Sequence, residues 1–309
     1  MNWQVLWPQP DGLGESPFWN PQEQTLYWVD IPNKQVRRAK VLLGTVESWA
    51  MPSEPGCIAP SAGGGFAIAL RDGMYRAAAW GGELALLARF DHDAKTTRFN
   101  DGKADPAGRF WAGTMYEPRD KALAQLFSLD ARAGGKPVIE RKAGDATIAN
   151  GLAWSPDEKT IYWTDTIQHT VWAWDWDKAS NAMSRQRLFA QFKPKPTGWQ
   201  YGLPGCTSET YGGRPDGAAV DALGNYWVAM FEGARVLKLS PAGEQLAEYR
   251  LPAQCPTMPC FGGADLRTLY VTTASHARPA AEMRDMPQSG CVFSMQVDVP
   301  GLPVNFFQG

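Results

Sequence analysis

The chain has 309 residues and a mass of 34.0 kDa, which suits one large all-β domain or two smaller domains. Its formal net charge of −2 at pH 7 gives no reason to expect nucleic acid or an anionic membrane as a partner. No apolar run approaches the length of a membrane span, and the first residues do not resemble a signal peptide. Five scattered cysteines are typical of reduced thiols, so we predict a cytoplasmic protein.

Six segments repeat a polar turn followed by an aromatic or apolar strand: 21–30, 62–70, 105–114, 156–165, 221–230 and 264–273. The aromatic residues that align in them are Tyr27, Phe66, Phe110, Tyr162, Tyr226 and Tyr270. Further short strands precede and follow most copies, with turns rich in glycine and proline. Four strands repeated six times predict a single all-β domain over residues 1–309, a six-bladed β-propeller with four antiparallel strands per blade. A β-sandwich is the alternative, but it does not explain six copies of one pattern.

The strand that precedes each repeated turn is expected to line the central channel. These strands begin at GESPFW (14–19), NDGKA (100–104), NGLAW (150–154), PDGAAV (215–220) and FGGAD (261–265). Four of the starts carry oxygen-bearing side chains in one register: Glu15, Asp101 with Asn100 beside it, Asn150 and Asp216. Asn-Gly and Asp-Gly pairs are common in turns, but converging buried carboxylates also require a cation.

We therefore predict one divalent metal ion at one end of the channel. Oxygen ligands suit Ca²⁺, Mn²⁺, Mg²⁺ or Fe²⁺, and Zn²⁺ also stays open. The three histidines, His92, His169 and His276, lie outside the strand starts and are expected in loops or on the surface. Cys255 and Cys260 lack the partners of a zinc site.

In order along the chain, these segments resemble the SMP-30/gluconolactonase (regucalcin-like) family, most specifically in RFNDGKADPAGRFWAGTM (98–115) and RPDG (214–217). The resemblance implies a six-bladed lactone hydrolase with one divalent metal. It also implies that Glu15, Asn150 and Asp216 are the metal ligands, and that Arg98 and Asn100 bind the substrate. Several members carry an extra acidic residue after the GTM block, and Glu117 of this chain lies near that position.

Hydrolysis of a sugar-acid lactone, such as a pentono- or hexonolactone, requires a polarised carbonyl and an activated water. Asp216 is then the base, or only a ligand, and the guanidinium of Arg98 holds substrate oxygens. Two alternatives remain open: a hydrolase of another ester or phosphotriester, and a propeller that binds a divalent metal without catalysis.

The second strand of each repeat returns to the metal face, so its following residues should overlook the pocket: Tyr116, Glu117, Asp165, His169, Ser275 and His276. The long connection at 193–213 enters the strand of Asp216 from the same face. Its glycines and prolines exclude a regular helix or strand. We predict that it forms a lid, with Trp199, Tyr201 and Tyr211 against the sugar ring; a flexible insertion without a role is the alternative.

Overall fold

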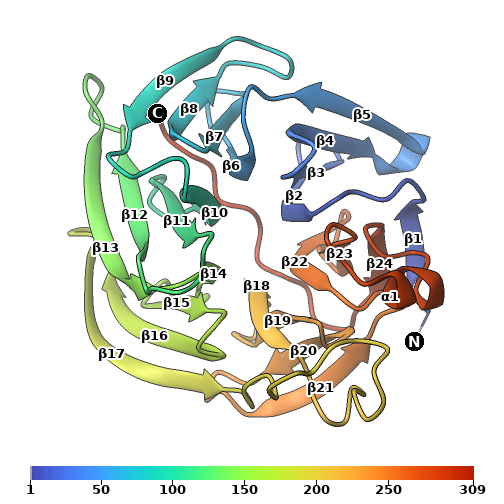
Figure 1. Cartoon of the computed structure of the whole chain (residues 1–309). Coiled ribbons are helices and arrows are strands. Elements are labelled where there is room, and N and C mark those ends of the chain that lie inside the picture. Colours follow the sequence, from blue (N-terminus) through green and yellow to red (C-terminus); the bar gives the residue numbers. More distant parts are fainter. Residues whose placement is uncertain (1) are drawn as a thin grey trace.

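Six four-stranded antiparallel sheets stand in a ring around a central channel in the computed structural model, which describes residues 2–309 (Figure 1). The predicted six-bladed β-propeller is confirmed. Blade one consists of β2 (Gly14–Asn20), β3 (Thr25–Asp30), β4 (Gln35–Lys40) and β5 (Thr45–Ala50). Blade two consists of β6 (Pro55–Pro60), β7 (Phe66–Leu70), β8 (Gly73–Ala77) and β9 (Leu84–Arg89). Blade three consists of β10 (Thr97–Ala104), β11 (Phe110–Tyr116), β12 (Ala124–Asp130) and β13 (Val138–Ala146). Blades four and five are β14 (Ala149–Trp154), β15 (Thr160–Asp165), β16 (Thr170–Asp177) and β17 (Ala182–Gln191), then β18 (Arg214–Val220), β19 (Tyr226–Phe231), β20 (Arg235–Leu239) and β21 (Gln245–Arg250).

The sixth blade joins the two ends of the chain. It consists of β22 (Pro256–Gly262), β23 (Thr268–Thr273), β24 (Val292–Gln296) and, at its outer edge, the N-terminal strand β1 (Gln4–Trp7). The sequence pattern did not predict this closure. It also placed the start of the innermost strand at FGGAD (261–265), which was wrong: this segment lies where β22 ends, because the strand begins five residues earlier than the glycine pair suggested.

Two short helices complete the secondary structure of residues 2–309: a 3-10 turn at Val41–Leu43 and α1 (Ala280–Asp285), which connects β23 to β24. No helix among these residues is long and apolar enough to span a bilayer.

The repeated turn works through an aspartate that caps it and a tryptophan that follows it. Asp105 Oδ1 accepts hydrogen bonds from the backbone of Ala107 and Arg109, and Oδ2 accepts the Trp111 indole N–H at 2.8 Å. Asp221 and Trp227 repeat this arrangement in blade five, with the indole bond at 2.9 Å. A buried indole N–H requires an acceptor, so the Asp and the Trp six residues later form one unit of the turn.

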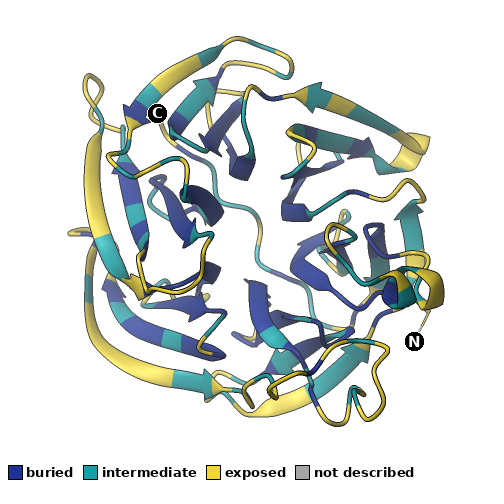
Figure 2. Cartoon of the chain, viewed as in Figure 1, coloured by how far each residue is buried: buried dark blue, intermediate teal, exposed yellow. Residues whose placement is uncertain are grey.

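The aromatic residues of the repeat pack between neighbouring blades. Tyr27 of blade one lies 5.1 Å from Phe66 of blade two, and Tyr162 of blade four lies 5.1 Å from Tyr226 of blade five, between ring centroids. The inner strands are buried throughout, while the outermost strands are largely exposed (Figure 2). The core is therefore the set of blade-to-blade contacts, and it leaves the inner strand ends fixed around the channel.

The C-terminal segment crosses the channel after β24 (Figure 1). Its Leu302 N–H donates to Val220 of blade five, and its Phe307 N–H donates to Pro60 of blade two. The Phe307 side chain is fully buried against the cores of blades two and three. This segment therefore ties distant blades together on the face where the inner strands end.

Candidate functional site

Four inner strands carry a β-bulge at the same height of the channel. The register shifts fall between Glu15 and Phe18, Phe99 and Gly102, Asn150 and Ala153, and Pro215 and Ala218. A bulge adds one residue to a strand and changes the direction in which its side chains point. The oxygen-bearing residues predicted from the sequence all lie at these bulges.

Asn150 shows how the local sequence shapes the bulge. Gly151 has φ of 62°, and a Cβ on it would lie 2.3 Å from Thr164 Oγ1 and 2.4 Å from the Tyr226 hydroxyl. Tyr226 donates its hydroxyl to the Gly151 carbonyl at 2.7 Å. The Asn-Gly pair is thus not a hairpin turn but a left-handed bulge that only glycine fits.

Three carboxyl groups are buried together at this end of the channel: Glu15, Asp101 and Asp216 are 5%, 3% and 6% exposed. Burial raises the pKa of Asp216 to about 8, and the charge of Asp101 adds to the rise while Arg214 opposes it. Burial also raises the pKa of Glu15, as do the charges of Asp216 and Asp101. The three groups therefore repel one another when they are ionised.

A chain of amide hydrogen bonds runs beside these carboxyls. Arg98 donates to Asn100 Oδ1 at 2.8 Å, and Asn100 Nδ2 donates to Asn150 Oδ1 at 2.8 Å. Asn150 Nδ2 in turn donates to Thr166 Oγ1 at 2.8 Å. The chain orients both amides, so that the Asn150 carbonyl oxygen is directed toward blade three.

The donor set suits a divalent cation that prefers oxygen. Asp101 Oδ2 accepts the Leu152 N–H at 3.0 Å, but its buried Oδ1 has no hydrogen-bond partner among residues 2–309. No group of three or more His, Cys, Asp and Glu side chains in that range is arranged to hold a metal, so a site here depends on the Asn150 amide oxygen as well. Oxygen ligands of mixed charge are typical of Ca²⁺ and Mg²⁺ sites, and a cation would offset the repulsion between Glu15 and Asp216.

The predicted substrate residues of blade three lie next to this set. Arg98 is buried, and its Nε lies 3.6 Å from Glu117 Oε1. Glu117 also pairs with Arg71, whose guanidinium donates to both carboxylate oxygens at 2.9 and 3.2 Å. Tyr116 is the last residue of β11, on the same face, and it is half-buried. Its backbone N–H donates a hydrogen bond to the Thr147 carbonyl. Arg71 was missed from the sequence, although it follows β7 just as Glu117 follows β11.

Comparison with known proteins shows the family to which the chain belongs. A model of the SMP-30/gluconolactonase/LRE-like region matches residues 13–275. The chain belongs to this family. Its resemblance to the family, inferred from the sequence, is confirmed, and so is the prediction of a gluconolactonase-like enzyme at the level of the family.

Three relatives cover nearly all of the chain. A 6-deoxy-6-sulfogluconolactonase from Pseudomonas putida is 43% identical over 97% of each chain. Regucalcin from Danio rerio is 33% identical over 96% of this chain and 95% of its own. Among solved structures, a calcium-binding protein, regucalcin, from Agrobacterium tumefaciens superposes with a TM-score of 0.86 at 25% identity, over 98% of this chain and 96% of that one.

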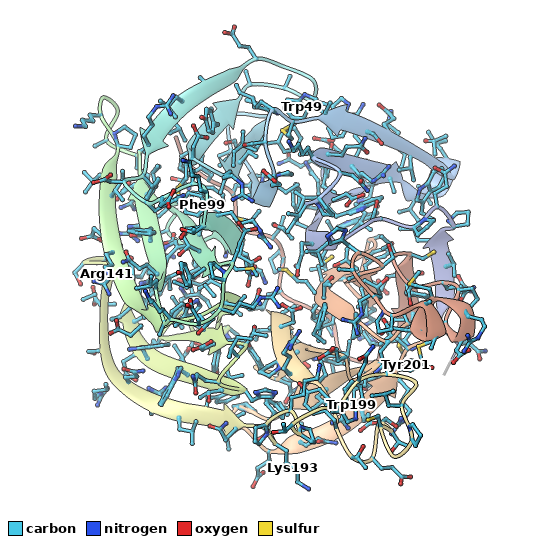
Figure 3. The ribbon with its side chains drawn as sticks, viewed as in Figure 1. Trp49, Phe99, Arg141, Lys193, Trp199 and Tyr201 are labelled. Carbon is cyan, nitrogen blue, oxygen red and sulfur yellow. The ribbon has the colours of Figure 1, made fainter. Side chains whose placement is uncertain are left out.

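The 193–213 segment of this family member lies on the face of the ring that carries the carboxyl cluster, beside α1, where a Cβ on Gly202 would contact Ala281 (Figures 1 and 3). Trp199 and Tyr211 are both buried, with ring centroids 5.0 Å apart. They form the segment's own small core, so the expectation that their faces are open to a sugar ring was wrong. Tyr201 alone of the three aromatic residues is partly exposed.

The remaining predictions for this face concern polar residues in its connections. His169 lies in the turn between β15 and β16, as expected for a loop residue, and it is buried, with its Nε2 hydrogen-bonded to the Tyr211 hydroxyl at 2.9 Å. Asp165 is also buried and accepts the N–H of Ile167 at 3.2 Å. Ser275 donates its hydroxyl to the Asp11 carbonyl at 2.6 Å. These groups stabilise the connections on the face that carries the carboxyl cluster.

A separate cavity of about 310 Å³ occupies the opposite end of the channel. Lys103 and Met258 line it, and the C-terminal residues Leu302 and Val304 close one side. Glu15, Asn100, Asn150 and Asp216 are not among its lining residues. The channel is thus divided between a polar end with the carboxyl cluster and a largely apolar end.

Proposed function

We propose that this protein is a metal-dependent hydrolase that opens a sugar-acid lactone to the free acid. The observation that carries the proposal is the convergence of Glu15, Asp216 and the Asn150 amide at one end of the channel, beside Arg98 and Asn100. Glu15, Asn150 and Asp216 would hold the metal, whose identity stays open among Ca²⁺, Mn²⁺, Mg²⁺, Fe²⁺ and Zn²⁺. When bound, it supplies Lewis acidity for the lactone carbonyl.

The protein's own groups would then position the substrate and move one proton. Asp216 accepts a proton from the attacking water at a carboxylate oxygen and returns it to the ring oxygen as the ester bond breaks. Its burial makes it a stronger base than an exposed aspartate. One amino group of Arg98 donates to the Phe99 carbonyl and to Asn100 Oδ1. Within residues 2–309 the other amino group donates only to the Met115 sulfur, so N–H donors remain for substrate oxygens.

The relatives support a hexonolactone as the substrate. A relative with 43% identity over nearly the whole chain is named a 6-deoxy-6-sulfogluconolactonase, so its named substrate is a six-carbon sugar-acid lactone. We also propose that residues 193–213 act as a lid that selects among lactones. Their ordered core and their place on the metal face support this role, with Tyr201 as the aromatic residue that remains available.

Acid release from a panel of substrates tests the proposal. Purified protein with added divalent metal should release acid from pentono- and hexonolactones faster than from aryl esters or phosphotriesters, and Asp216→Asn should abolish the rate. Faster turnover of the aryl ester or the phosphotriester would favour the alternative hydrolase. Metal binding without turnover of any of them would favour a binding protein.

A further inference from the structure

Arg71 connects blade two to blade three beside the carboxyl cluster. It lies in the turn after β7, and its guanidinium pairs with Glu117, the residue that follows β11. Glu54, which directly precedes β6, pairs with a second edge of the same guanidinium. None of the three residues lies on an inner strand, so the pairing stands next to the predicted metal ligands and not among them.

Every N–H donor of the Arg71 guanidinium has an acceptor. Nε donates to Glu54 Oε2 at 3.0 Å, and one amino group donates to the Ala94 carbonyl and to Glu117 Oε2, both at 2.9 Å. The other amino group donates to Glu54 Oε1 at 3.3 Å and to Glu117 Oε1 at 3.2 Å. An arginine has five N–H donors, so Arg71 has none left for a substrate. Its paired hydrogen bonds instead fix the orientation of both carboxylates.

Glu117 lies between Arg71 and Arg98. Its Oε1 accepts a hydrogen bond from Arg71 and lies 3.6 Å from Arg98 Nε, which is too far for a hydrogen bond. Two cations thus compete for one carboxylate, and Arg71 holds it. The Arg98 side chain, only 8% exposed, therefore keeps donors that Glu117 does not occupy.

We propose that Arg71 is a positioning residue of the lactone site: it holds Glu117 in place and so keeps N–H donors of Arg98 free for substrate oxygens. This inference rests on the proposed lactonase function. Without Arg71, the Glu117 carboxylate loses two hydrogen bonds, and Arg98 is the other cation within 4.0 Å of it among residues 2–309. A charge-assisted pair formed there would occupy donors that the substrate requires.

A double-variant cycle tests the proposal. The kcat/KM for gluconolactone is measured for the wild type, Arg71→Gln, Glu117→Gln and the combination of both. Losing a hydrogen bond to a charged group costs roughly tenfold to hundredfold, so Arg71→Gln should lower kcat/KM by about tenfold or more. In the Glu117→Gln background the same change should cost less than about threefold, because a neutral amide does not capture Arg98.

An equal loss in both backgrounds would show that Arg71 only supports the turn after β7, and it would overturn the positioning role. No loss for Arg71→Gln would overturn it as well. Arg71→Lys keeps a cation between the two carboxylates and should retain more activity than Arg71→Gln. If Arg71→Gln does not fold, Arg71→Lys takes its place in the cycle, and its smaller loss should again disappear with Glu117→Gln.

The matched control is Arg89→Gln in the same blade. It removes an exposed ion pair, in which Arg89 lies 2.9 Å from Asp72, the residue next to Arg71. This variant should leave kcat/KM unchanged in both backgrounds.

A crystal structure of Arg71→Gln gives a measurement that does not depend on turnover. The distance from Arg98 Nε to Glu117 should shorten from 3.6 Å to hydrogen-bond length, about 2.9 Å. An Arg98 side chain that stays in place would overturn the proposal even if activity fell. Absence of lactone turnover by the wild type would instead overturn the proposed function, while a shortened distance would still assign the position of Arg98 to Arg71.

Discussion

Removal of the metal should make the stability of this protein depend on pH, because burial raises the pKa of Asp216 to about 8. In the unfolded chain an aspartate has a pKa of about 3.9. Between these two values, the folded state holds a proton that the unfolded state has already released. Stability falls with rising pH wherever the folded state binds more protons, so the metal-free protein loses stability as the pH rises from about 4 to about 8.

The size of the stability loss follows from the difference between the folded and unfolded pKa of Asp216. Each pKa unit corresponds to 1.36 kcal/mol, so Asp216 alone accounts for a loss of about 3 kcal/mol between pH 5 and pH 7. An unfolding entropy of about 2 cal/mol/K per residue converts this into a fall of about 4 °C in Tm for a chain of 309 residues. Burial and the charge of Asp216 both raise the pKa of Glu15, which adds to the fall because the pair titrates together.

Calorimetry of chelator-treated protein at pH 5, 6, 7 and 8 measures this dependence. The wild-type Tm should fall with pH, Asp216→Asn should fall much less and melt higher than the wild type at pH 8, and added Mn²⁺ should restore the wild type but not the variant. Asp298→Asn, at an exposed position away from the channel, is the matched control and should follow the wild type. A metal-free wild-type Tm that is flat or rises between pH 5 and 8, relative to Asp216→Asn, would refute the raised pKa of the buried Asp216 from which this prediction follows.

Three further predictions concern other parts of the molecule. Arg98→Ala should lower kcat/KM for the lactone about 10- to 100-fold and leave Mn²⁺ affinity intact in a calorimetric titration, whereas loss of the metal would make Arg98 a support for the ligands. Phe307→Ala should cost about 3–5 kcal/mol in a denaturant titration, because the fully buried ring joins the C-terminal segment to two blades; a cost below about 1 kcal/mol would mean that this segment does not brace the ring. Replacing residues 193–213 by a short Gly-Ser linker should change the ranking of lactones by kcat/KM with metal affinity preserved, and an unchanged ranking would refute the lid.

The blades could be predicted from the sequence because each repeat is a local unit. The turn aspartate, the glycine three residues later and the following strand lie within about ten residues, as Asp105 and Trp111 show. Closure of the ring could not be predicted in the same way. β1 pairs with β24 across almost the whole chain, and a short strand such as QVLW has no pattern that names its partner.

The same contrast holds for the candidate site. Glu15, Asn150 and Asp216 were found because one register repeats in four blades, and the bulges keep that register in the structure. The ion pair of Arg71 with Glu117 joins residues 46 positions apart, in two blades. Both residues follow the second strand of their blades, but the repeat does not specify which charge stands at that position. His169 and Tyr211 are likewise paired across 42 positions, which is why loop residues expected to be open are buried against each other.

The proposed lactone hydrolysis requires one divalent metal, held at the channel end by Glu15, Asn150 and Asp216. The initial rate of gluconolactone hydrolysis by chelator-treated protein during stepwise addition of Mn²⁺ tests this requirement. The rate should start near the uncatalysed value, rise in proportion to added metal and level off at one equivalent, with no rise for Asp216→Asn. Full activity of the metal-free protein, or a rise in Asp216→Asn equal to that of the wild type, would contradict the claim.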